Sequence, residues 1–299
     1  MMRVPPDYTI NAGGRLMSLA TPKVMGILNV TPDSFYAGSR KQTEHDIACR
    51  ACEIAAQGGD IIDVGAFSTR PGAPQVQEAE EMERLRKGLA TVRRELPDAV
   101  LSVDTFRPDV ARMAVEEFGA AIINDVSEGN TRGAFGGTEA GSGPEAEGGA
   151  VPPMFAMAGR LGVPYILMSV RSTLPEMMKA FAAETQMLHA AGVKDIILDP
   201  GFGFGKTVEQ NYAILAAMDR LHVLGLPVLA GVSRKSMIFR PLGVTPDGAL
   251  NGTTVLNTMA LERGAAILRV HDVREAVEAV RLAGCLAAAC GATQNDNQQ

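Results

Sequence analysis

The apolar residues of the chain gather in eight short runs that are separated by longer amphipathic segments. Each run is nearly continuous in aliphatic side chains, which is typical of parallel strands that are covered on both faces. The runs span residues 24–30, 60–65, 99–105, 120–125, 163–169, 194–200, 226–233 and 265–272. This pattern predicts eight strands of a parallel sheet.

The segments between these runs have the period of amphipathic helices. Between residues 81 and 96, Leu85, Leu89 and Val92 advance in steps of three and four, so that one helix face is apolar. We expect Glu81 and its acidic neighbours to form a solvated face of this helix. Further helices are predicted at 107–118, 175–191, 208–223 and 273–290.

Strands that alternate with helices eight times predict a (β/α)8 TIM barrel, an α/β fold formed here by a single domain. A length of 299 residues suits such a domain. The alternative is an open, doubly wound sheet, whose first strand is often followed by a G-x-G-x-x-G fingerprint. The sequence "NVTPDSF" follows the first strand here instead, which favours the barrel.

The domain organisation follows from the same pattern. We predict an N-terminal extension at 1–22, a barrel domain at 23–290 and a disordered tail at 291–299. Residues 128–153 are rich in Gly, Glu and Pro and contain few large apolar side chains. Such a segment buries too little surface to offset its ordering entropy, so we predict a flexible insertion after the fourth strand.

Composition and charge narrow the functional classes. Hydrophobic residues make up 46% and charged residues 21%, which is typical of a globular protein, and the net charge is -6. Without a dominant basic patch, nucleic acid is not an expected partner. We find neither a signal peptide nor an apolar run of about 18 residues, so we expect a cytoplasmic protein without a membrane span. The Cys49-x-x-Cys52 pair lies in a helical pattern, and we expect buried or half-buried free thiols.

Polar side chains stand at or just after the ends of the predicted strands. In a barrel these ends surround one mouth. The set comprises Asn29, Ser68, Thr69, Arg70, Asp104, Asn124, Asp125, Ser169, Asp199, the stretch 233–236, Arg269 and His271, and the apolar Met168 stands beside Ser169 at the end of the fifth strand. For a single member, a capping or structural role is an equal alternative. Together, the cations and the carboxylates favour a site for an anionic group such as phosphate beside a hydrogen-bonding ring.

Seven motifs give these positions a common interpretation. They are "MGILNVTPDSF", "DVG-x-x-STRPG", "SVDT", "IND", "LDPGFGFGK", "SRKS" and "RVHD", and they occur in this order between residues 23 and 282. In this respect the chain resembles the dihydropteroate synthase family of the folate pathway. The resemblance implies a TIM barrel that condenses 6-hydroxymethyl-7,8-dihydropterin diphosphate with 4-aminobenzoate, with Mg²⁺ as cofactor.

The resemblance also implies roles for individual residues. Asn29 would be the magnesium ligand. The diphosphate would be held by Thr69, Arg70, Arg269 and His271.

The other substrate positions follow in the same way. The pterin would be bound by Asp104, Asn124, Asp199 and Lys235, with Met168 also in contact with substrate. Among these, Asp104, Asp199 and Lys235 would take part in catalysis. The aminobenzoate site, which sulfonamides target in this family, would be lined by Pro71, Phe204 and Ser236.

Some features depart from the family pattern or leave alternatives open. Ala66 and Phe67 stand where the family often has Gly and Glu, and Ser169 stands where many members have His. The segments 31–40 and 67–72 resemble the family's mobile loops, and a homodimer is implied. A pterin-dependent methyltransferase domain and a non-catalytic pterin-binding protein are the alternative functions. The first would have no diphosphate to hold, and the loss of Asn29, Lys235 or Asp104, which are all present, would have indicated the second.

Overall fold

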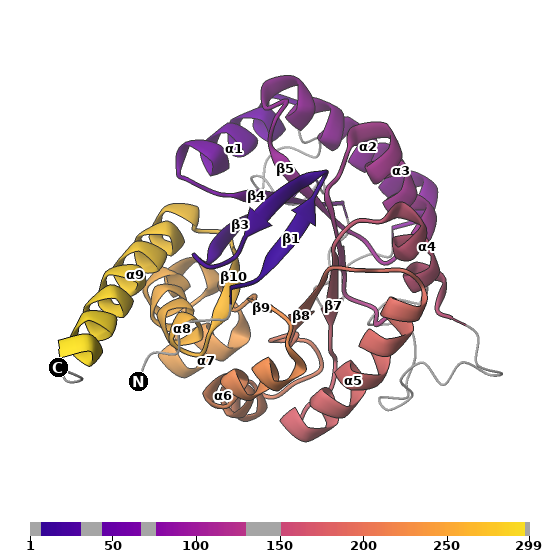
Figure 1. Cartoon of the computed structure of the whole chain (residues 1–299). Coiled ribbons are helices and arrows are strands. Elements are labelled where there is room, and N and C mark those ends of the chain that lie inside the picture. Colours follow the sequence, from indigo (N-terminus) through magenta and orange to yellow (C-terminus); the bar gives the residue numbers. More distant parts are fainter. Residues whose placement is uncertain (1–6, 31–43, 67–75, 130–150, 297–299) are drawn as a thin grey trace.

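A computed structural model describes residues 7–30, 44–66, 76–129 and 151–296. Within these residues, eight parallel strands close into a barrel, and helices surround it (Figure 1). The strands are β3 Lys23–Asn29, β4 Ile61–Gly65, β5 Val100–Asp104, β6 Ile122–Asp125, β7 Tyr165–Met168, β8 Ile196–Asp199, β9 Val228–Ala230 and β10 Ala265–Val270. The predicted single-domain TIM barrel is confirmed.

The helices lie outside the barrel and follow the strands in turn. They are α1 Glu44–Ala56, α2 Glu78–Glu95, α3 Pro108–Phe118, α4 Pro153–Leu161, α5 Leu174–Ala190, α6 Val208–Ala216, α7 Ser236–Leu242, α8 Leu250–Glu262 and α9 Val273–Asp296. Two 3-10 helices, η1 Met218–Leu224 and η2 Pro246–Ala249, complete the connections. None of the helices within the described ranges is long and apolar enough to cross a membrane.

Strand pairing closes the barrel between the last strand and the first. Residues Ile267 to Val270 of β10 pair in parallel with Lys23 to Gly26 of β3, and β10 also pairs with β9. Because strand side chains alternate with a period of two, one set points into the barrel and the other toward the helices. Val64 and Leu101 belong to the outer core, which the helices cover.

The N-terminal extension forms a hairpin rather than a simple lead-in. Strands β1 Thr9–Ala12 and β2 Arg15–Ser18 pair antiparallel, and Gly13 and Gly14 make the turn with positive φ. The hairpin lies across the barrel in Figure 1, and Ile10 packs with inward residues near the strand starts. It therefore closes the end of the barrel opposite to the strands' carboxyl ends.

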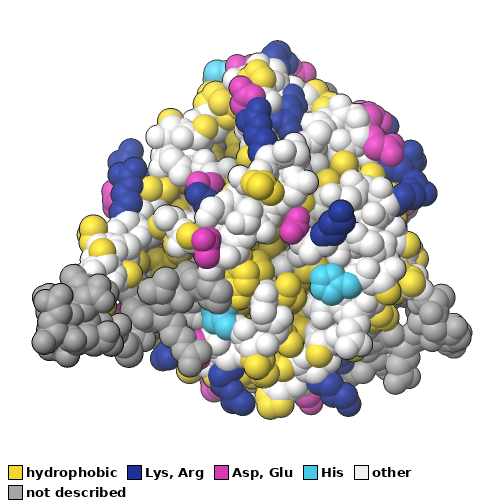
Figure 2. Space-filling view, in the orientation of Figure 1, with side chains coloured by type: hydrophobic (Ala, Val, Ile, Leu, Met, Phe, Trp, Pro, Cys, Tyr) yellow, Lys and Arg dark blue, Asp and Glu magenta, His cyan; other side chains and the backbone are white. Residues whose placement is uncertain are grey.

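The surface around this closed end is mixed in character. Figure 2 shows basic and acidic side chains scattered among apolar ones, without a large patch of one charge on this face. Such a distribution suits a solvated surface rather than a nucleic-acid contact.

Three expectations need correction. Helix α9 continues to Asp296, so residues 291–296 of the predicted disordered tail are helical. The alanine-rich run before residue 291 favours this extension of the helix. Glu81 is fully buried rather than solvated. Cys49 and Cys52 are free but exposed, because they lie on the outer side of α1.

The insertion predicted over 128–153 lies mostly outside the described residues. Its first residue, Glu128, is nevertheless buried, with 4% of its surface exposed. Its last residue, Pro153, already begins α4. Both ends of the segment therefore belong to the packed domain.

The hairpin offers a test of how the closed end supports the barrel. Leu19, just after β2, is fully buried, whereas Leu16 in β2 is 80% exposed. We expect Leu19→Ala to lower the free energy of unfolding by about 2–5 kcal/mol. The matched control Leu16→Ala should change it by about 0.5 kcal/mol or less. Urea unfolding followed by circular dichroism measures both, and equal losses in the two variants would refute the packing role of the hairpin.

Candidate active site at the barrel mouth

The inward positions of the strands change from apolar to polar toward the carboxyl ends. In β8, Ile197 lies in the inner core and Asp199 follows it two residues later. In β10, Ile267 is followed by Arg269 in the same way. The period of two therefore brings polar side chains together at one mouth, above an apolar interior.

A guanidinium group bridges two carboxylates in this mouth. Arg269 donates from Nε to Oδ2 of Asp63 and from Nη2 to Oδ2 of Asp104, both at 2.6 Å. Asp63 also accepts a 3.0 Å hydrogen bond from Nδ2 of Asn124. The bridge thus connects β4, β5, β6 and β10 across the barrel.

Asp63 is a site residue that the sequence reasoning missed. It lies inside an apolar run, whereas the predicted site residues stand at or after strand ends. The usable signal was the alternation in β4, because Asp63 stands two residues after the inward Ile61. Its Oδ1 atom has no hydrogen-bond partner among the described residues, although the side chain is fully buried.

Burial shifts the proton affinities of the acidic groups in the mouth. It raises the pKa of Asp104 to about 7, and repulsion from Asp63 acts in the same direction while Arg269 opposes it. Burial also raises the pKa of Asp199, against the effect of Lys235. With a pKa of about 7, the carboxyl group of Asp104 can either donate or accept a hydrogen bond near pH 7.

Lys235 lies beside Asp199 and contacts the glycine loop that follows β8. Burial lowers the pKa of Lys235 to about 8, and Asp199 partly offsets this. Its Nζ atom donates to the carbonyl of Phe202 and lies 4.7 Å from the ring centroid of Phe204. This cation-π contact fixes the ammonium group over the aromatic ring.

The glycines of the loop are required by its backbone. Gly201 and Gly203 have φ of 64° and 82°, which favour glycine. A Cβ on Gly201 would lie 2.3 Å from the carbonyl oxygen of Ser169. Asp199 accepts the amide of Gly201 at 2.7 Å through Oδ1, so its carboxylate is held at the loop entrance.

His271 is held by Ser233 at the rim of the mouth. Oγ of Ser233 accepts the backbone amide of His271 at 3.1 Å and lies 3.0 Å from its Nδ1. Burial, aided by the charge of Arg269, lowers the pKa of His271 to about 4, so the ring is neutral at pH 7. If the hydroxyl donates to Nδ1, the ring proton resides on Nε2, which can then donate to an anion.

The motifs "SRKS" and "RVHD" are tied to each other by an ion pair. Arg234 donates to both carboxylate oxygens of Asp272, at 3.0 and 2.7 Å. Its φ of 54° is unusual for a residue other than glycine. Arg234 lies within the predicted stretch 233–236 but was assigned no role of its own, and here it orients the loop that precedes Lys235.

The remaining predicted residues lie as follows. Oδ1 of Asn29 and Oδ2 of Asp104 face the same space over Gly65, at 3.6 and 3.5 Å from a Cβ built there. Met168 is fully buried at the end of β7, and Ser236 begins α7. The predicted Thr69, Arg70 and Pro71, like Phe67, lie outside the described residues.

A second set of buried charges lies behind the mouth. Asp125 points outward from the barrel, accepts the hydroxyl of Tyr165 and accepts the amides of Ser127 and Gly129, so it is not part of the mouth. Its structural hydrogen bonds confirm the alternative interpretation of this residue. Near it, Glu128 accepts the amide of Val170 at 3.0 Å.

Glu184 on α5 belongs to this second set. It is 2% exposed, and its Oε2 has no hydrogen-bond partner within the described residues. Burial raises its pKa to about 8, with a contribution from the charge of Glu128, while Arg171 opposes the shift. The carboxyl group is therefore mostly protonated at pH 7.

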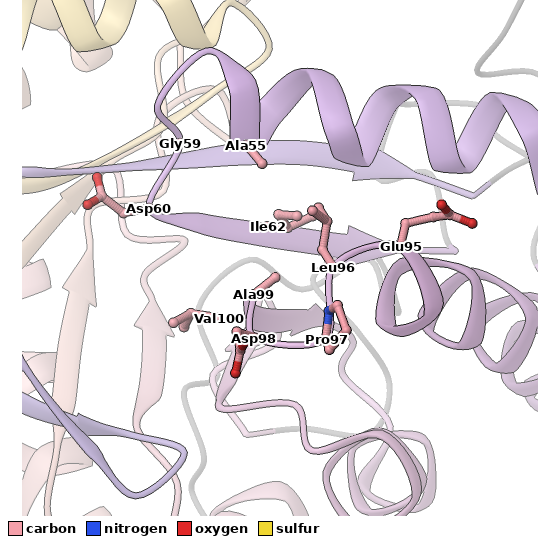
Figure 3. A pocket seen from close by; sticks show the side chains of 10 residues that line it. All are labelled: Ala55, Gly59, Asp60, Ile62, Glu95, Leu96, Pro97, Asp98, Ala99 and Val100. Carbon is pink, nitrogen blue, oxygen red and sulfur yellow. The ribbon is translucent and has the colours of Figure 1, made fainter.

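A cavity of about 290 Å³ lies at the other end of the barrel (Figure 3). Its lining comes from the residues before β4 and β5 and from the ends of α1 and α2. Two of its carboxylates already have partners, since Asp60 pairs with Lys23 at 3.3 Å and Asp98 pairs with Arg15 at 3.1 Å. The third carboxylate, Glu95, pairs with Arg94 at 3.0 Å, and the cavity is separate from the polar mouth.

Comparisons with known proteins agree with this geometry. The model of the family described as pterin binding enzyme matches residues 25–271. The chain is 38% identical to dihydropteroate synthase of Escherichia coli K12, over 91% of this chain and 94% of that protein. It is 37% identical to the Bacillus subtilis enzyme, over 84% of each.

Solved structures give the same result. Dihydropteroate synthase of Xanthomonas albilineans with 4-aminobenzoic acid has a TM-score of 0.82 at 34% identity, over 94% of this chain and 99% of that one. The fold and the site thus define a pterin-binding barrel enzyme. Within this class, the chain belongs to the dihydropteroate synthase family, the transferases of folate biosynthesis.

Glu184 provides a test of the buried charges. Its pKa is about 8 in the folded protein against 4.5 as an ordinary glutamate, so the folded state binds more protons between these values. Wild-type stability should therefore fall as the pH rises through this window, by at most about 1.4 kcal/mol per pH unit from this group. We expect Glu184→Gln to stabilise the protein more at pH 8 than at pH 5. Urea unfolding at both pH values measures this, and a pH-independent difference would contradict the buried, protonated state.

Proposed function

We propose that the barrel mouth condenses 6-hydroxymethyl-7,8-dihydropterin diphosphate with 4-aminobenzoate to form 7,8-dihydropteroate and diphosphate. The observation that carries the proposal is the Arg269 bridge to Asp63 and Asp104, which lies beside the Asp199 and Lys235 pair. It brings acceptors for ring N–H groups next to cations that suit a diphosphate. The neighbour from Xanthomonas albilineans was solved with 4-aminobenzoic acid and also with 7,8-dihydropteroate, which supports the same ligands here.

The pterin ring would bind among Asp104, Asn124, Asp199 and Lys235. Carboxylate oxygens of Asp104 and Asp199 would accept ring N–H groups, and Asn124 can both donate and accept. Met168, fully buried in the barrel, would form an apolar contact below the ring. As the bond to the leaving group breaks, the two carboxylates would stabilise positive charge on the pterin.

The diphosphate would bind at the rim. Arg269 offers a planar fork of donors, and neutral His271 offers one N–H. Thr69 and Arg70 are proposed to complete this subsite on the strength of the family motif alone. These donors would stabilise the negative charge that develops on the leaving oxygen.

The residues of the mouth are compatible with Mg²⁺. The oxygen of Asn29 faces the same space as a carboxylate oxygen of Asp104, and Mg²⁺ prefers oxygen ligands while retaining water and substrate phosphates. No group of three or more His, Cys, Asp or Glu side chains among the described residues forms a separate metal site. Asn29 would hold the ion, which when bound supplies charge neutralisation for the diphosphate.

The reaction requires no protein nucleophile. The aniline nitrogen of 4-aminobenzoate attacks the exocyclic methylene carbon of the pterin, a C–N bond forms, and the C–O bond to diphosphate breaks with its electron pair. The nitrogen then loses a proton. The protein would contribute by orienting the two substrates and by stabilising both developing charges.

The second substrate would lie next to the glycine loop. Phe204 is half-buried beside Lys235, so its ring can pack against the aminobenzoate ring. Ser236 would bind near the carboxylate of this substrate, and Pro71 would line the same site. Sulfonamides, which have a similar ring, would compete for this position.

Quaternary structure and location remain proposals. Exposed apolar side chains on α8 and α9, among them Val255, Met259, Leu282 and Leu286, support a homodimer formed away from the mouth. Sedimentation velocity analysis that gives the mass of a monomer would refute the homodimer. A cytoplasmic location fits small polar substrates, and cell fractionation would test it.

The central experiment is a product assay with purified protein, the pterin diphosphate, 4-aminobenzoate and Mg²⁺, each omitted in turn. We expect diphosphate and dihydropteroate in equal amounts, and release only when all components are present. A non-catalytic pterin-binding protein would bind the pterin diphosphate without releasing diphosphate. A methyltransferase domain would instead bind methyl-folate and leave the diphosphate ester intact.

Asp199 tests the pterin assignment directly. Asp199→Asn keeps the acceptor for the amide of Gly201 but replaces a carboxylate oxygen with an amide donor. We expect pterin diphosphate to bind at least about 100-fold more weakly, as is usual when a buried charged partner is lost. Calorimetric titration measures this, and Asp195→Asn, just before the same strand at the opposite end, is the control. Wild-type affinity in Asp199→Asn would remove the assignment.

A further inference from the structure

The glycine loop after β8 is held by a lysine that the proposed reaction does not use. Nζ of Lys206 donates to the carbonyl of Ser169 at 2.8 Å, to that of Gly201 at 2.9 Å and to that of Phe204 at 3.1 Å. An ammonium group has three N–H donors, so these contacts use its full capacity. The lysine therefore ties both ends of the loop to the end of β7.

The loop needs such an anchor because its backbone is unusual. Gly201, Gly203 and Gly205 all have positive φ, between 61° and 82°. Each glycine adds conformational freedom that the folded loop has to lose. Charge-assisted hydrogen bonds to carbonyls are stronger than neutral ones, so one ammonium group can stabilise this conformation.

Other contacts hold the residues of the loop that precede Phe204. Asn211 on α6 accepts the amide of Gly203 at 2.7 Å, and Lys235 binds the carbonyl of Phe202. Lys235 also covers the ring of Phe204 from the side of the mouth. Lys206 holds the backbone of the same residue through its carbonyl, so the two lysines act on Phe204 at different atoms.

The backbone of Asp199 is anchored independently of Lys206. It ends β8 in register with Met168, and its backbone carbonyl accepts the amide of Ser169 at 2.9 Å. The strand therefore fixes the backbone of Asp199 even if the loop beyond it moves, while its carboxylate also accepts the amide of Gly201. Loss of Lys206 should affect the loop more than the strand.

We propose that Lys206 is a positioning residue that fixes Phe204 for the arylamine substrate without contacting that substrate. The proposal rests on the proposed function, because it takes Phe204 as a wall of the aminobenzoate site. It gives the two substrate sites different main supports: the backbone of Asp199 depends on β8, and the backbone of Phe204 depends on the lysine anchor. A change at Lys206 should therefore distinguish the arylamine from the pterin.

The test uses Lys206→Met, which removes the donors at nearly constant length, and Lys194→Met as the matched control. Lys194 is exposed and precedes β8 at the opposite end of the barrel. We expect Lys206→Met to raise KM for 4-aminobenzoate about tenfold, in line with the loss of hydrogen bonds to a charged group. The calorimetric Kd for pterin diphosphate should rise less than this KM, because the backbone of Asp199 stays in β8, and the control should match wild type.

Two results would overturn the proposal. One is an unchanged KM for 4-aminobenzoate in Lys206→Met, and the other is an equal weakening of both substrates, which would indicate a general structural role. If Lys206→Met fails to fold, Lys206→Arg replaces it, because a planar guanidinium cannot direct donors to the same three carbonyls. A wild-type KM in Lys206→Arg would also overturn the proposal.

Hydrogen exchange provides a readout that does not depend on the reaction. In Lys206→Met, amides of the peptide 199–206 should exchange faster than in wild type, while those of β4 should not change. Unchanged exchange in this peptide would refute the anchor. A further outcome is that the wild-type protein forms no dihydropteroate while the loop exchanges faster in Lys206→Met. That result would refute the proposed function but would still support the structural role of Lys206 in the loop.

Discussion

The guanidinium of Arg269 lies between Asp63 and Asp104, and the polar mouth depends on this bridge. Two carboxylates buried close together would repel each other strongly without a cation between them. The bridge is possible only because the barrel closes, which brings β10 next to β3 and within reach of β4 and β5. The closure of the sheet therefore determines both the charge balance of the mouth and the orientation of Arg269.

The alternation of side chains along the strands divides buried polar groups between two tasks. Asn124 points inward and binds Asp63, whereas the next residue, Asp125, points outward and binds Tyr165. The inward set can meet substrates. Asp125, together with Glu128 in the loop after β6, orders the loops behind the mouth. A shift of one residue in register would exchange the two sets.

The sequence predicted the barrel because strand and helix periods alternate clearly, and it predicted a polar mouth because polar side chains stand at strand ends. Asp63 was missed because an apolar run surrounds it. Glu81 was expected in solvent because its neighbours are acidic, yet it binds Thr105 at 2.7 Å and also pairs with Arg107. These partners come from another strand end, so the burial of Glu81 follows from tertiary packing that local pattern cannot show.

The mouth depends on the planar geometry of Arg269 and not on its charge alone. The most direct test is kcat/KM for dihydropteroate formation in Arg269→Lys, compared with wild type and Arg269→Met. Lysine keeps the charge but cannot bridge two carboxylates as a fork does. We predict a loss of about 100-fold or more in Arg269→Lys, close to that of Arg269→Met. Near wild-type activity in Arg269→Lys would contradict the account.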